Sequence, residues 1–232
     1  MSAKAIQVGR QRLAQALAED ADLTALLDRY DRWAQDLWDG LEVVYNANTL
    51  LPQIIDVIVK IHKSRSKELK QRDQERILRP DWFQDPNAIG YVCYTDLFAG
   101  DLQGIRKRIN YLKGLGVTYL HLMPLLNPRP GNSDGGYAVM DYKSVRSDLG
   151  TMNDLAELAA DLHDAGISLT LDLVLNHVAK EHEWAQKARN GEEKYQNYFY
   201  VFPDRKIPDE YEKSLPEIFP TFAPGNFTYY QD

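Results

Sequence analysis

Apolar residues recur at helical spacing through residues 1–80. One stripe, at positions i, i+4, i+7 and i+11 of a single helical face, consists of Leu26, Tyr30, Trp33 and Leu37. A second stripe consists of Leu51, Ile54, Ile55, Ile58 and Ile61. Arg79-Pro80 ends the region, because the residue before a proline is pushed out of the helical conformation. The pattern predicts an all-helical N-terminal domain at residues 1–85.

Short apolar runs then alternate with helical stripes. Runs typical of buried strands occupy residues 89–98, 117–126 and 168–177. Helical stripes lie between them at 101–116 and 151–165, and Thr151 with Asp154 forms a capping-box pattern at the start of the second. The stretch between residues 127 and 150 is rich in glycine and proline and is expected to be a long polar loop. Strands separated by helices in this way pair in parallel, with the helices packed outside, so the fold class is α/β.

The βα pattern occupies residues 86–177, and no further βα unit follows it. Residues 178–232 are aromatic, proline-rich and polar, and they are expected to form an irregular insertion. In parallel sheets and barrels, functional side chains gather at the carboxyl ends of the strands. This rule places Asp96, residues 123–127, and Asn176 with His177 at one common rim.

Charge and cysteine content narrow the class of protein. The net charge of −7 argues against a nucleic-acid partner, which would need basic clusters to meet the phosphates. Cys93 is the only cysteine, which excludes an internal disulfide and favours a reducing compartment. The N-terminus lacks the apolar core of a signal peptide, and no stretch approaches the roughly 20 apolar residues of a membrane span. We expect a cytoplasmic protein with no membrane partner, either a monomer or a homodimer.

The histidines give little support for a metal site. The spacing of His177 and His182 is not the i, i+4 pair that places two ligands on one helical face, so these residues with Glu183 make a poor zinc site. We predict no metal. His121 is expected to be packed within its strand, and His62 is expected at the surface of a helix.

The segment SDGGYAV at residues 133–139 allows two interpretations. It is either an ordinary loop, or a tight Gly-Gly turn that presents Tyr137 and Asp134 to a sugar. Sugars have apolar C–H faces and polar edges, so an aromatic ring beside a carboxylate, an asparagine and a histidine suits them.

Several stretches resemble one known family. DLVLNH (172–177) resembles the first signature region of glycoside hydrolase family 13, the α-amylase family, and GGYAV with the following DY resembles the loop after its second strand. Within that family the chain resembles the amylosucrases. The stretches that carry this resemblance are LRPDWF, DLFAGDLQGI, LGVTYLHLMPLL, SDGGYAV, NHVAKEHEWAQKA, YVFPDR and LPEIFP, together with the helical N-terminal region.

The resemblance implies a sucrose-dependent α-1,4-glucan glucosyltransferase with sucrose and α-glucan as partners. The glucosyl unit would pass to the enzyme and then to a glucan, with retained configuration through a double displacement that requires no cofactor. It also implies that the three βα units are the start of a (β/α)8 barrel. Three parallel strands cannot close a barrel that takes eight, so we expect the barrel to be incomplete.

The resemblance also assigns substrate-binding roles to individual residues. Tyr137 matches the platform under the glucosyl ring, and His177 matches the histidine that hydrogen-bonds the 6-hydroxyl of that ring. Asp134 matches an aspartate that pairs with a distant arginine. Asp172 matches a supporting aspartate in mid-strand. Asn176 matches a calcium-binding position of many α-amylases; amylosucrases generally lack that calcium, so its expected role is structural.

No position of this chain matches the catalytic nucleophile or the acid/base of the family. Both are expected downstream of Asp232, so we expect the chain to be an inactive N-terminal fragment. One alternative is another family-13 enzyme, namely a sucrose hydrolase, a trehalose synthase or an α-amylase. A second alternative is a non-catalytic, decayed relative.

Overall fold

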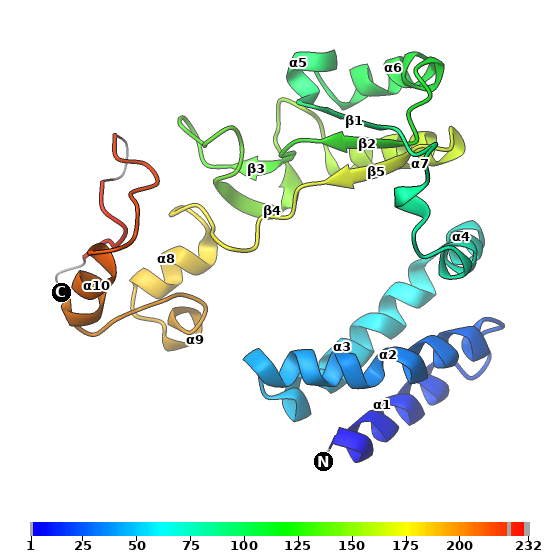
Figure 1. The fold of residues 1–232 in the computed structure, drawn as a ribbon, viewed down its shortest axis with the longest axis horizontal. Coiled ribbons are helices and arrows are strands. Elements are labelled where there is room, and N and C mark those ends of the chain that lie inside the picture. Colours follow the sequence, from blue (N-terminus) through cyan, green and yellow to red (C-terminus); the bar gives the residue numbers. More distant parts are fainter. Residues whose placement is uncertain (1, 222–223, 230–232) are drawn as a thin grey trace. The chain divides into compact units, whose positions relative to one another are not determined.

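The chain folds into two compact units, Met1–Phe83 and Gln84–Asp232. The computed structural model describes residues 2–221 and 224–229, so positions 222–223 and 230–232 of the expected insertion lie outside the described part. Figure 1 shows the helices of the first unit in blue and cyan and the mixed α/β elements of the second from green to red. Among the described residues, no helix combines the length and apolar character needed to cross a membrane.

The first unit is helical throughout, as expected. Its helices are α1 Ser2–Ala16, α2 Leu23–Val44, α3 Ala47–Ser64 and α4 Lys67–Leu78, followed by a 3₁₀ turn, Trp82–Gln84, at the boundary. Two of the helices have side-chain caps: Asn46 accepts from the Thr49 N–H, and Ser66 accepts from the Leu69 N–H. The core that joins α1, α2 and α3 consists of Leu13, Tyr30, Ala34, Trp38, Leu41, Ala47, Leu51 and Ile55.

The buried face of α2 differs from the predicted stripe. Trp33 is 60% exposed, whereas Ala34 and Trp38 are buried. A stripe drawn through the largest apolar residues misses the small Ala34, at which two helices can approach closely, and so is rotated away from the true contact face. The surface position expected for His62 is also wrong. Its side chain is only 11% exposed, because it packs 3.1 Å from the carboxylate of Asp20.

The second unit contains a parallel sheet of three short strands, β1 Gly90–Cys93, β2 Tyr119–Leu122 and β5 Ser168–Leu171, in the order β1-β2-β5. Helix α6 (Leu102–Gly114) connects β1 to β2, and α7 (Met152–Asp164) precedes β5. The spatial order of the strands therefore repeats their order along the chain. The predicted parallel βα units are confirmed, and the described residues form no closed barrel.

Both helices cover the same face of this sheet. Register aligns Leu120 with Leu169 and Leu122 with Leu171, and these residues pack against the leucines of α6 and α7. The opposite face carries the row Val92, His121 and Thr170, and Val92 is 60% exposed. A doubly wound sheet has helices on both faces, whereas a barrel has them only outside. Among the described residues, helices therefore pack on one face of this sheet only, which distinguishes it from a doubly wound sheet.

The strands are shorter than predicted. The expected strand 89–98 ends at Cys93, and its second half forms helix α5, Thr95–Ala99. β1 is also only partly covered, so the expectation of a buried strand is wrong. The three strands stop in register at Cys93, Leu122 and Leu171. Pro124 lies just beyond β2 and has no N–H with which to extend the ladder.

A hairpin occupies the stretch expected to be a polar loop. β3 (Leu126–Pro128) pairs antiparallel with β4 (Val139–Val145). Beyond residue 178, the described part of the chain contains three short helices and no further βα unit. These are α8 Glu183–Arg189, α9 Glu193–Gln196 and α10 Lys206–Glu212.

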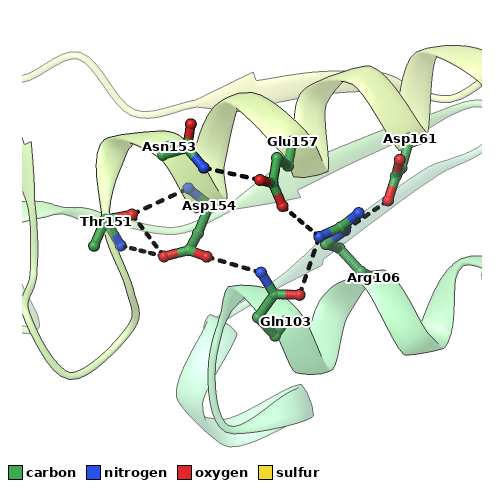
Figure 2. A network of polar contacts seen from close by, with 7 residues as sticks. All are labelled: Gln103, Arg106, Thr151, Asn153, Asp154, Glu157 and Asp161. Atoms are coloured by element: carbon green, nitrogen blue, oxygen red, sulfur yellow. Dashed lines mark hydrogen bonds and ion pairs between the residues drawn. The ribbon is translucent and has the colours of Figure 1, made fainter.

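Polar side chains join α6 to α7 on their solvent side (Figure 2). The Arg106 guanidinium lies 2.6 Å from Glu157 and 2.6 Å from Asp161. Gln103 donates to Asp154 at 2.8 Å. The predicted capping box is confirmed, with Thr151 and Asp154 exchanging side-chain-to-backbone hydrogen bonds. The same carboxylate thus caps α7 and contacts α6, which sets both the start of α7 and its position against α6.

Candidate functional site

Polar side chains meet beyond the carboxyl ends of β2 and β5. Asp172 is the first residue after β5, not a mid-strand residue as expected. One of its carboxylate oxygens lies 3.3 Å from Nε2 of His121. The other accepts from the Tyr137 hydroxyl at 3.5 Å. Asp172 therefore bridges a strand histidine and the tyrosine of the hairpin turn.

The turn that carries Tyr137 requires its two glycines. Asp134 (φ 53°), Gly135 (φ 63°) and Gly136 (φ 96°) all have positive φ, a conformation open mainly to glycine and less often to Asp or Asn. Ser133 O accepts from Gly136 N and from Ala138 N at 3.1 and 3.0 Å. A Cβ at Gly136 would lie 3.1 Å from Pro124 Cβ. The backbone thus turns tightly against the end of β2 and directs Tyr137 to the site.

His177 contacts the same turn. Its Nε2 lies 3.2 Å from the backbone carbonyl of Tyr137, and its Nδ1 lies 2.8 Å from the side-chain nitrogen of Asn176. Because a carbonyl can only accept, Nε2 carries the proton and donates, and Nδ1 accepts from the Asn176 amide. The partners therefore select the neutral tautomer with hydrogen on Nε2.

Tyr142 of β4 holds the segment that follows β5. Its hydroxyl hydrogen-bonds the backbone carbonyl of Val174 and lies 3.2 Å from that of His177. Ala179 N also donates to Val139 O at 2.9 Å. The hairpin and the segment from Val174 to Ala179 are therefore joined as one framework. Sequence reasoning gave Tyr142 no role, although it lies in the DY of the family-like stretch and in the β-prone run VMDYKSV.

Burial and charge both act on Tyr137. Burial, followed by the negative charge of Asp172, raises the pKa of the Tyr137 hydroxyl above its ordinary value of 10.0. The hydroxyl therefore stays protonated at neutral pH and can donate to Asp172. Asp134 is exposed on the turn, and its carboxylate receives no hydrogen bond from the described side chains.

Asp96, expected at the rim, is engaged elsewhere. Arg146 contacts it at 2.7 Å and contacts Asp148 at 2.8 Å. The Arg146 hydrogen bond is the largest cause that lowers the pKa of Asp96. Asp96 therefore ties the start of α5 to the end of the hairpin and lies outside the group around Tyr137.

The residues considered for zinc do not converge. His182 is buried, and its Nδ1 accepts from the Trp184 N–H; burial lowers its pKa. Glu183 pairs with Lys187. Among the described residues, the one grouping with ligand-like spacing is Asp20, Asp22 and His62, but Lys70 already lies 3.3 Å from both carboxylates. The Lys70 ammonium already neutralises the negative charge of these carboxylates, which a metal ion would need for binding.

His121 is the second residue whose contribution to the site sequence reasoning missed. It was expected to be packed within its strand; it is partly buried, lies on the face of the sheet opposite α6 and α7, and points to Asp172. Its side chain is 30% exposed. The signal was present in the alternation of YLHL, in which the two leucines face the helices and His121 must face the other way.

Comparison with known proteins matches the second unit. Residues 77–228 match the family described as alpha amylase, catalytic domain. A probable oligo-1,6-glucosidase from Bacillus subtilis is 36% identical over 127 residues, which are 55% of this chain and 21% of that protein. An alpha-glucosidase from Candida albicans is 31% identical over 153 residues, which are 66% of this chain and 25% of that protein. The chain thus spans about a quarter or less of the length of these curated relatives.

Solved structures that resemble this chain also cover about half of it and less than a quarter of their own length. A trehalose-6-phosphate hydrolase from Bacillus licheniformis has 34% sequence identity and a TM-score of 0.48, covering 54% of this chain and 23% of that one. A trehalulose synthase variant has 34% identity and a TM-score of 0.45, covering 49% of this chain and 22% of that one.

Proposed function

The chain belongs to the alpha-amylase catalytic-domain family, and on that premise we propose that it forms the glucosyl-binding part of an enzyme acting on α-glucosides. The observation that carries the proposal is the meeting of Tyr137, Asp172 and His177 beyond the ends of parallel strands. Tyr137 offers an aromatic face to the apolar side of a glucose ring, and the neighbouring polar groups suit its hydroxyls.

Each residue has a distinct task in this proposal. Asp172 holds the Tyr137 hydroxyl, which orients the ring. His177 offers its Nε2–H, now directed at the Tyr137 carbonyl, to the 6-hydroxyl of the sugar. Asn176 donates to Nδ1 of His177 and so favours the tautomer that makes this donation possible. Asp134 stands exposed on the turn, free to meet an arginine, as the family resemblance implies.

The reaction class is a retaining double displacement, which requires two carboxyl groups on opposite sides of the glycosidic bond. Asp134 is reserved by the family resemblance for an arginine, and the other acids near the site already have partners. Asp172 contacts His121 and Tyr137, Glu181 pairs with Arg129 at 3.0 Å, and Glu183 pairs with Lys187. We therefore assign the nucleophile and the acid/base to residues outside these 232.

The curated relatives favour cleavage of α-glucosidic bonds over sucrose-dependent polymer synthesis. The two named above are an oligo-1,6-glucosidase and an alpha-glucosidase by description. Water would then intercept the covalent glucosyl intermediate. Sucrose-dependent glucosyl transfer is the second candidate. It is favoured by the helical unit Met1–Phe83, almost all of which precedes the family match at residue 77 and which resembles the helical domain of amylosucrases.

Binding of methyl α-D-glucoside, followed by NMR titration of the chain, tests the glucosyl site. We expect Tyr137→Ala to weaken binding at least about tenfold, since it removes the stacking face, and Tyr200→Ala, on an exposed tyrosine, to leave it unchanged. Equal affinity of the Tyr137→Ala variant and the parent would contradict the proposal.

Activity assays separate the two candidate reactions and test the assignment of the carboxylates. We expect the 232-residue chain to release no fructose from sucrose and no glucose from isomaltose, and turnover of either sugar by this chain would refute that assignment. In a polypeptide that continues past Asp232, glucose alone would identify a hydrolase, and insoluble α-glucan from sucrose would identify a transferase. A coding sequence that stops at Asp232 would favour the non-catalytic alternative.

A further inference from the structure

We propose that His121 is a positioning residue that sets the orientation of the Tyr137 ring through Asp172. This inference rests on the proposed glucosyl site and adds to it a residue on β2 that touches neither the tyrosine nor, in this proposal, the sugar.

Strand register places His121 where it can act. His121 pairs with Thr170, and side chains alternate along β5, so Asp172 projects to the same face as Thr170 and His121. This is the face opposite the leucines that pack against α6 and α7. A histidine on β2 and an acid just after β5 are thereby brought together.

The contact involves a buried nitrogen for which the described residues supply no other partner. Nε2 of His121 is covered by protein atoms and makes no well-directed hydrogen bond within the described residues. The acceptor that lies near it is Asp172 Oδ1, at 3.3 Å. A covered N–H without a partner costs free energy, so a small rotation that completes the bond to Asp172 is favoured.

Asp172 divides its two oxygens between the two partners. Oδ1 faces His121, and Oδ2 accepts from the Tyr137 hydroxyl at 3.5 Å. The Asp172 side chain is only 23% exposed, so water satisfies little of its charge. If His121 is removed, Oδ1 loses its neighbour, and the carboxylate can rotate away from Tyr137.

The tyrosine ring is held at both ends. The turn from Ser133 to Ala138 fixes its backbone, and Asp172 fixes its hydroxyl. With both ends held, the plane of the ring is defined before a sugar arrives, so less side-chain freedom is lost on binding. His121, on β2, contributes to that preorganisation through its contact with Asp172.

Two variants of His121 test whether its contact with Asp172 orients Tyr137. His121→Leu removes the ring nitrogens with little loss of volume, whereas His121→Gln keeps an N–H donor near the position of Nε2. His163→Leu, at a half-buried histidine in the last turn of α7, is the matched control. The first readout needs no sugar: the ring-carbon NMR signals of ¹³C-tyrosine, with the Tyr137 signal identified by its loss in Tyr137→Phe.

We expect His121→Leu to shift the Tyr137 signal and His121→Gln to restore it, with no shift in the control. We also expect His121→Leu to weaken methyl α-D-glucoside binding about fivefold to tenfold, the size expected when a charge-assisted contact is lost. In a Tyr137→Phe background, which lacks the hydroxyl, His121→Leu should have no further effect on binding. A purely structural role would make the two effects additive.

The outcomes separate this inference from the proposed function. An unmoved Tyr137 signal in His121→Leu, or additive effects in the double variant, would overturn the role of His121 alone. Unchanged sugar binding in Tyr137→Ala would overturn the glucosyl site, whereas the tyrosine NMR signals would still report whether His121 orients the ring.

Discussion

Nε2 of His177 lies 3.2 Å from the backbone carbonyl of Tyr137, although 40 positions separate the two residues in the chain. This bond joins the segment after β5 to the turn between β3 and β4. The two residues assigned to the glucose ring therefore hold each other in place, and a change that loosens either element should affect both.

Replacing Tyr142 with phenylalanine should loosen this framework. The Tyr142 hydroxyl donates to the backbone carbonyls of Val174 and His177. Its loss should destabilise the second unit by about 1–2 kcal/mol, because a partly buried acceptor then lacks a donor. Urea unfolding measures the change. Tyr200→Phe, at a tyrosine that is 95% exposed, is the control and should leave the unfolding free energy unchanged.

Replacing Asp172 with asparagine should lower the pKa of Tyr137. Burial is the larger cause that raises this pKa, and the negative charge of Asp172 is the next. Removing the charge should move the pKa down toward 10.0 without reaching it, since the burial remains. Tyrosine NMR signals followed between pH 8 and pH 12 report the value. A pKa that rises or stays constant would contradict the assigned contact.

The interface between α6 and α7 should depend more on its leucines than on its charges. Leu158 is fully buried, and Leu158→Ala should cost about 3 kcal/mol through lost burial and the cavity left behind. Arg106→Met removes the contacts to Glu157 and Asp161 at the solvent side and should cost clearly less, because exposed ion pairs are screened. Amide hydrogen exchange in β2 compares the two, and a larger effect of Arg106→Met would reverse this ranking.

Asp20 should make the helical unit sensitive to acid. The backbone N–H of Asp22 is the largest cause, followed by His62, that lowers the pKa of Asp20 from 3.8 to about 2. A carboxyl group whose pKa is depressed by folding stabilises the fold above its unfolded pKa, and this contribution is lost as the pH falls from about 4 to 2. Asp20→Asn should therefore weaken the unit at neutral pH and flatten its acid response in that window.

Hydrogen exchange of the α2 and α3 amides measures this effect. The control is Asp28→Asn, which removes an exposed carboxylate of α2. An acid response that is unchanged in Asp20→Asn would show that other carboxyl groups carry the transition.

The longer helices could be read from the sequence because their signals are local. The capping box of Thr151 and Asp154 and the leucine stripe of α7 lie within about four turns of one helix, and both were confirmed. The strands were harder to delimit, since their ends depend on partners. β1 stops where β2 stops, and Pro124, 31 positions after Cys93, is part of the reason.

The site was only partly accessible from the sequence for a similar reason. Family resemblance singled out Tyr137 and His177, and the structure brings them together. The role of His121 depends on strand register. The role of Tyr142 depends on a hairpin whose glycine- and proline-rich connection suggested a loop. No local pattern carries the information that Leu122 aligns with Leu171, and that alignment brings His121 to Asp172.

The strand order β1-β2-β5 also bears on synthesis. The parallel strands β2 and β5 each pair with a strand that leaves the ribosome before them, and the hairpin partner of β4 is β3, which also precedes it. The described part of the sheet can therefore assemble from its N-terminal end as the chain is made. With this order, the unpaired N–H and C=O groups along the open edge of β1 or β2 stay exposed only until the next parallel strand has been translated.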